Sequence, residues 1–76
     1  MQKKLNEFIV GETGKIVKIT ATGKIKRRLF DMGITPGAIV SLKKVAPLGD
    51  PLEVNLRGYE LTLRKDEAEN VIMEVN

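Results

Sequence analysis

The sequence contains no cysteine and no histidine. Without cysteine the chain can form neither a disulfide framework nor a thiolate metal site. Without histidine it lacks the most common general base and the most common transition-metal ligand. Serine and cysteine nucleophiles usually need an adjacent histidine, which closes the main route to covalent catalysis. We therefore predict that the protein is not an enzyme and has neither catalytic residues nor a cofactor.

Carboxylates remain as the one group suited to catalysis or metal binding. Asp66, Glu67 and Glu69 crowd at the expected start of a helical turn, where the helix dipole stabilises negative charge. Acid–base catalysis needs a carboxyl group whose neutral form is favoured by burial, so a structural role is the better interpretation. Glu67, Glu69 and Glu74 show no repeated ligand spacing, and we predict no metal site.

Long apolar segments are also missing. No apolar run approaches the roughly 18 residues that a membrane-spanning helix needs, and the polar opening MQKKLNE has no apolar signal region. We expect a soluble, cytoplasmic protein without membrane insertion. Its 76 residues suffice for one domain, residues 1–76.

Charge is unevenly distributed along the chain. Residues 1–45 carry ten Lys and Arg against three Asp and Glu, whereas residues 46–76 carry three against seven. Such a chain can present a basic face to an anionic partner, although both charge sets can equally be solvated surface.

Glycine and proline divide the sequence into short elements. Alternating or β-branched residues predict five strands, over residues 15–21, 38–45, 52–57, 59–64 and 71–75. In the first strand, Val17, Ile19 and Ala21 are expected to share one face. Gly58 alone separates the third and fourth strands, which predicts a tight antiparallel hairpin. The inward side chains of this hairpin are predicted to be Leu52, Val54, Leu56, Tyr59, Leu61 and Leu63.

A short basic helix is expected from residue 24. Thr22 can cap its N-terminus, and Gly33 supplies a left-handed C-terminal cap. Pro36-Gly37 then suits a type II turn, and Lys43-Lys44 interrupts the second strand with a bulge. The apolar stripe of the helix is predicted to comprise Ile25, Leu29 and Met32.

A second, acidic helical turn is predicted near the end of the chain. Asp66 and Glu69 match a variant of the capping box, and Asn70 can end the turn in the left-handed region. The sum is an all-β-dominated fold with about five strands, one short basic helix and one acidic turn. A small SH3-like or OB-like barrel fits, because closure removes exposed edges, and the pattern alone does not choose between these topologies.

The helix and one loop are the candidate interaction segments. Lys24, Arg27 and Arg28 share one face of the helix, which suits an acidic protein surface, anionic lipid or nucleic acid, or is simply solvated. Nucleic acid is disfavoured because only three aromatic residues are available for base stacking. In the proline-bounded loop 46–51, Leu48 can either contact a partner or fold back over the barrel mouth.

Five segments, in this order and spacing, resemble the FeoA family of ferrous iron transport proteins: RLFDMGI (28–34), PG (36–37), APLGDP (46–51), LRGY (56–59) and LRKDEA (63–68). The resemblance runs from about Leu5 to Val75. It implies an SH3-like barrel, shared with the C-terminal domain of iron-dependent repressors. It also implies a cytosolic accessory role beside FeoB, a membrane permease with a GTPase domain.

The resemblance assigns candidate residues position by position. The helix motif of the family is matched by Arg28, Leu29, Asp31, Met32 and Gly33, and its loop motif by residues 47–51. We predict that partner binding uses Lys24, Arg27, Arg28, Asp31, Pro47, Leu48, Gly49 and Asp50. A small nucleic-acid-binding barrel and a metal-sensing module related to the iron-dependent repressors remain as alternatives.

Overall fold

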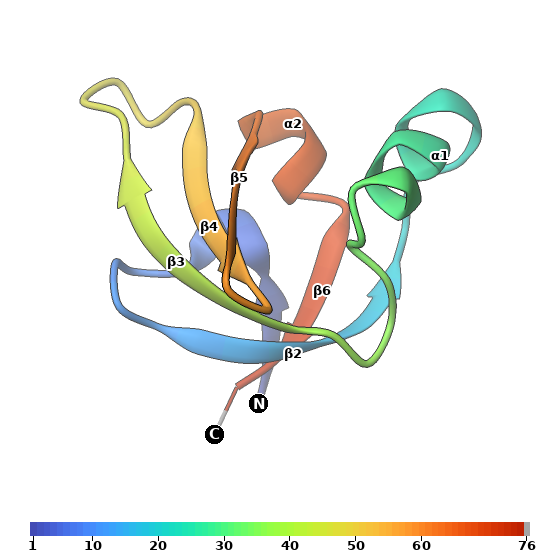
Figure 1. The fold of residues 1–76 in the computed structure, drawn as a ribbon, viewed down its shortest axis with the longest axis horizontal. Helices are drawn as coiled ribbons and strands as arrows, with labels where there is room; N and C mark the ends of the chain where they lie inside the picture. Colours follow the sequence, from blue (N-terminus) through green and yellow to red (C-terminus); the bar gives the residue numbers. More distant parts are fainter. Residues whose placement is uncertain (76) are drawn as a thin grey trace.

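The computed structural model describes residues 1–75 and consists mainly of one antiparallel sheet (Figure 1). The strand order is β1-β6-β2-β3-β4-β5. The helical segments are the 3-10 turn η1 (Leu5–Glu7), α1 (Gly23–Asp31) and α2 (Lys65–Ala68). The strands are β1 (Gln2–Lys4), β2 (Thr13–Ile19), β3 (Ile39–Val45), β4 (Leu52–Leu56), β5 (Tyr59–Leu63) and β6 (Val71–Glu74).

The sheet curls around a single apolar core, as a small barrel does (Figure 1). Strands β1 and β5 lie at its two edges, and hydrogen bonds between strands do not close it within residues 1–75. The mostly-β architecture with one basic helix and one acidic turn confirms the predicted fold class, with one strand more than predicted. No helix in this part of the chain is long and apolar enough to cross a membrane.

The core takes side chains from η1, from α1 and from the strands. Burying each large aliphatic side chain contributes about 1.5–3 kcal/mol, so these contacts are the main source of stability. The largest fully buried side chains are Leu5, Ile16, Leu29, Ile34, Leu42, Leu63 and Met73.

Bulges reset the inward-facing positions in two strands. The pairing of β2 with β6 shifts between Ile16 and Lys18, so Ile16 is buried whereas Val17 is 38% exposed. The prediction that Val17 shares the face of Ile19 and Ala21 is therefore wrong, because the extra residue interrupts the alternation. In β3, a second shift between Leu42 and Lys44 confirms the predicted bulge.

The β4–β5 hairpin closes through Arg57 and Gly58, whose φ angles are +52° and +86°. Two positive φ values are typical of a type I′ turn, which matches the twist of the flanking strands. Burial along β5 decreases from Leu63 through Leu61 to Tyr59, which is 70% exposed. The predicted inward position of Tyr59 is thus wrong, although its partner Leu56 is buried: β5 is the edge strand within residues 1–75, so no strand flanks Tyr59 on its other side. The β4 prediction is confirmed at Leu52, Val54 and Leu56.

The N-terminal strand β1 was absent from the sequence prediction. It pairs antiparallel with β6, with Gln2 opposite Glu74 and Lys4 opposite Ile72. Its polar sequence has no apolar alternation, so its strand conformation comes from pairing with β6 rather than from local preference.

Helix α1 begins one residue earlier than predicted, at Gly23. Thr22 occupies the N-cap position, but its side chain makes no capping hydrogen bond. Leu29 is fully buried, Met32 is half-buried and Ile25 is 38% exposed, so the predicted stripe packs mainly through its C-terminal half. Gly33 adopts φ +90° and confirms the predicted left-handed cap.

Helix α2 is capped two residues earlier than predicted. The Glu67 carboxylate accepts the backbone N–H of Arg64 at 2.8 Å, so the capping contact joins Arg64 and Glu67 rather than Asp66 and Glu69, and the Arg64 side chain makes no return bond. Asn70 does not enter the left-handed region; its side-chain amide instead donates to the carbonyl oxygen of Asp66 at 2.7 Å. This bond satisfies a helix-end carbonyl without a positive φ.

Candidate functional site

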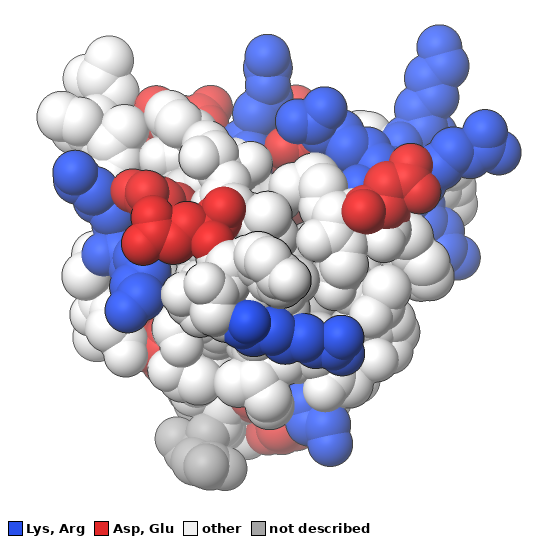
Figure 2. Space-filling view, in the orientation of Figure 1, with Lys and Arg blue, Asp and Glu red and all other residues white. Residues whose placement is uncertain are grey.

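The predicted interaction residues lie at one end of the molecule, in two separate groups. The β3–β4 loop projects on one side of α2, and α1 lies on the other (Figure 1). Figure 2 shows Lys and Arg side chains gathered around α1, and a projection without charged side chains at the loop. The structure therefore offers an apolar tip and a basic helix rather than one continuous patch.

The loop presents Leu48 fully to solvent. This side chain is 97% exposed, which excludes the alternative in which it folds back over the barrel. Gly49 adopts φ +87°, and its N–H donates to the carbonyl oxygen of Ala46 at 2.7 Å. Ala46 in turn donates its N–H to the carbonyl oxygen of Pro51 at 3.1 Å. These bonds define the loop conformation, and the apolar tip is held outward.

Asp50 ties the loop to the start of α2. Its Oδ1 accepts the backbone N–H of Lys65 at 3.0 Å, which satisfies a helix-end N–H. Asp50 therefore positions the loop, and like Pro47 and Leu48 it is exposed.

The three basic residues predicted to form one helical patch have different environments. Lys24 and Arg27 are exposed, as is Asp31 at the end of the helix. Arg28 instead turns to α2, where its Nε lies 2.5 Å from the Glu67 carboxylate. The Glu67 side chain is only 7% exposed, whereas that of Arg28 is 59% exposed. Arg28 thus links the two helices while part of its guanidinium remains open to solvent.

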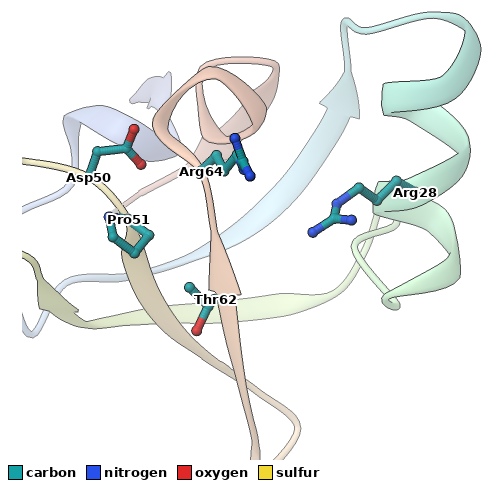
Figure 3. A pocket seen from close by; sticks show the side chains of 5 residues that line it. All are labelled: Arg28, Asp50, Pro51, Thr62 and Arg64. Carbon is teal, nitrogen blue, oxygen red and sulfur yellow. The ribbon is translucent and has the colours of Figure 1, made fainter.

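A pocket of about 420 Å³ lies between the loop, β5 and α1 (Figure 3). It brings together Arg28 and Asp50, which were predicted as interaction residues from distant segments. Thr62 and Arg64 also line it, and the sequence reasoning missed both. Thr62 lies at an outward position of the β4–β5 hairpin, and this position was the one feature of the sequence that could have indicated its role. No feature of the sequence indicated that Arg64 lines a pocket.

Two carboxyl groups with shifted pKa values lie elsewhere. The ion pair with Lys3 (Nζ–Oε1 2.7 Å) and the backbone N–H of Ile9 lower the pKa of Glu12. The N-terminal ammonium group of Met1 lowers the pKa of Glu74. Both pairs hold the β1 region against the rest of the sheet. Among residues 1–75, no group of three or more His, Cys, Asp or Glu side chains is placed to hold a metal ion.

Comparison with known proteins identifies the family. A model described as the FeoA domain matches residues 3–75. The chain belongs to the FeoA family. FeoA proteins are non-catalytic accessory proteins of ferrous iron transport, which agrees with the prediction that this chain is not an enzyme.

Solved FeoA structures confirm the fold. The FeoA-like protein of Clostridium acetobutylicum is 39% identical with a TM-score of 0.90, covering 97% of this chain and 86% of that one. Stenotrophomonas maltophilia FeoA, solved in complex with zinc and described as a procaryotic SH3 domain protein, is 26% identical with a TM-score of 0.82, covering 95% and 89%. The SH3-like topology is therefore the correct one of the two predicted.

A curated relative joins an Fe(2+) transport protein A to the Fe(2+) transporter FeoB. The Fe(2+) transport protein A/Fe(2+) transporter FeoB fusion protein of Porphyromonas gingivalis (strain ATCC BAA-308 / W83) is 28% identical over 72 residues. The match covers 95% of this chain and spans 8% of the length of the fusion protein.

Proposed function

We propose that this chain binds the cytosolic part of a FeoB-type permease and regulates ferrous iron transport through that contact. The observation that carries the proposal is the fusion relative, in which FeoA and FeoB are parts of one polypeptide. A covalent link of this kind gives an intramolecular contact an effective concentration in the millimolar range. A separate FeoA-family chain needs an interface of its own to reach the same state.

Two surfaces suit such an interface. Leu48 is a solvent-exposed aliphatic side chain on a loop held by hydrogen bonds, so its burial in a partner pocket costs little ordering entropy. Lys24 and Arg27 on α1 can accelerate the encounter with an acidic partner surface. In this proposal the loop contributes mainly to affinity and the helix mainly to the association rate.

Leu48→Ser tests the loop, with association to purified FeoB cytosolic region measured by a pull-down and a titration. Complete burial of one leucine is worth about 1.5–3 kcal/mol, so affinity should fall about tenfold to hundredfold. Ile9→Ser is the matched control, because Ile9 is 72% exposed in another loop. Equal affinities of the two variants for FeoB would show that Leu48 is not part of the interface.

Reversing two charges tests the helix. The variant Lys24→Glu/Arg27→Glu should lower the association rate and its dependence on salt, while the dissociation rate changes little. Lys4→Glu/Lys18→Glu is the control, since these exposed lysines flank β6 on the sheet. If wild-type FeoB association were undetectable even at low salt, the proposed function itself would fail.

A further inference from the structure

Strand β5 forms an open edge of the sheet. Within residues 1–75 it pairs with β4 alone. In a two-residue hairpin the residues that flank the turn, Leu56 and Tyr59, form a hydrogen-bonded pair, and such pairs then alternate. Glu60 and Thr62 occupy the other positions, so their backbone N–H and C=O groups point away from β4. Both residues are exposed, and their backbone groups are accessible to another strand.

The open edge lies beside the pocket described above. In Figures 1 and 3, β4 lies on one side of β5 and α1 on the other. Thr62 lines the pocket with Arg28 and Arg64, whose guanidinium groups point towards one another across it (Figure 3). A strand added to this edge would place the residue opposite Thr62 on the same face, next to both guanidinium groups.

Two arginines and one carboxylate line the pocket, so its lining residues carry one net positive charge before Glu67, the partner of Arg28, is counted. Arg28 has the Glu67 carboxylate as its partner, whereas no carboxylate in residues 1–75 lies within 4.0 Å of the Arg64 guanidinium. Asp50 supplies the carboxylate in the pocket lining, and its Oδ1 accepts the N–H of Lys65. A further carboxylate between the two arginines would receive charge-assisted hydrogen bonds, which are about twice as strong as neutral ones.

We propose that an extended, acidic segment of a protein partner adds to β5 as a further strand and places one carboxylate between Arg28 and Arg64. The backbone edge supplies strand pairing, and the arginines select the side chain. A free oxyanion would use the arginines alone, whereas an extended acidic peptide uses both features. The inference rests on the proposed function in that it describes the segment by which FeoB, or a protein of the same role, is recognised.

The test titrates the 15N-labelled full chain with the blocked peptide acetyl-Ser-Val-Glu-Val-Ser-amide and follows backbone amide shifts. The matched probe replaces the central glutamate with glutamine. We expect saturable shifts at the amides of residues 60–64, and affinity for the glutamine peptide lower by about tenfold. This experiment contains no FeoB, so the strand inference can fail while FeoB association by the full chain is retained.

Two variants distinguish the contribution of the Arg64 side chain to peptide binding from that of the β5 backbone. Arg64→Gln leaves the backbone N–H that caps α2 in place, and it should abolish the preference for glutamate; Lys18→Gln is the charge-matched control. Thr62→Pro removes one outward N–H without removing a bond to β4, which edge strands tolerate, and it should weaken both peptides. Retained dispersion of the amide spectrum verifies that each variant is folded.

Three results would overturn the inference: equal affinity for the two peptides, shifts that map away from β5, or no saturable shifts at all. Titration with inorganic phosphate tests whether the pocket binds a small anion instead of a strand. If phosphate shifted the amides around Arg28 and Arg64 while the glutamate peptide did not, the pocket would be a small-anion site and strand addition would be refuted.

Discussion

Replacing Glu67 with alanine tests whether one buried carboxylate holds the two helices together. Glu67 makes two contacts: its Oε1 accepts the N–H of Arg64 at 2.8 Å, and its Oε2 lies 2.5 Å from Nε of Arg28. The first contact caps α2 and the second joins α2 to α1. Alanine removes both, together with most of the buried side chain.

The expected loss of stability follows from these parts. Removing a capping side chain costs about 1 kcal/mol. The ion pair contributes about 0.2–1 kcal/mol, because the Arg28 side chain is 59% exposed and solvent screens the interaction. Lost burial of the methylene groups brings the total to about 2 kcal/mol. In a chain of this size, 1 kcal/mol corresponds to about 4–8 °C, so the melting temperature should fall by about 8–16 °C.

Thermal unfolding followed by circular dichroism measures this loss. Glu69→Ala is the matched control, because Glu69 is exposed and follows α2 directly, and it should change the melting temperature by less than about 3 °C. Glu67→Gln keeps an oxygen that can accept the capping N–H and should fall between the two. If Glu67→Ala and Glu69→Ala melted at the same temperature, the carboxylate would not stabilise this junction and the reasoning would be refuted.

Two further predictions concern the sheet. Gly14→Ala should lower the free energy of unfolding in urea by about 1–3 kcal/mol, because the added Cβ would lie 2.8 Å from the carbonyl oxygen of Glu74 and 3.0 Å from Cζ of Phe8. Unchanged stability would show that β2 and β6 can move apart freely at this point. Folding lowers the pKa of Glu12 and Glu74, so their stabilisation is complete above the ordinary value of 4.5 and is lost as pH falls through the lowered values. Glu12→Gln should flatten the fall of melting temperature between neutral pH and about pH 3, whereas the exposed Glu60→Gln should not; identical profiles would contradict the assignment.

Local pattern accounts for much of the fold. Strand β4 alternates apolar and polar residues, and its three apolar side chains are buried as predicted. Gly33 and Gly37 both adopt positive φ, because the ends of a helix and a type II turn require conformations that other residues rarely take. Such features depend on neighbours within a few residues, and the sequence displays them directly.

Pairing between distant segments accounts for the misses. Strand β1 has a polar sequence and becomes a strand because β6 offers an edge to it. Val17 faces outward because a register shift against β6 adds a residue to β2. Neither effect produces a periodic pattern of apolar residues in the sequence. Each depends on the position of β6, which is more than fifty residues away along the chain.

The same distinction explains the candidate site. Helical spacing places Lys24, Arg27 and Arg28 on one face, and a helix considered alone would present three equivalent charges. The fold makes them unequal, because α2 presents the Glu67 carboxylate to Arg28 and to neither of the others. Residue types and helical geometry therefore predict that a basic surface exists. They do not predict that Arg28 is the charge that pairs with α2 and points across a pocket towards Arg64. That depends on the packing of α1 beside α2 and β5.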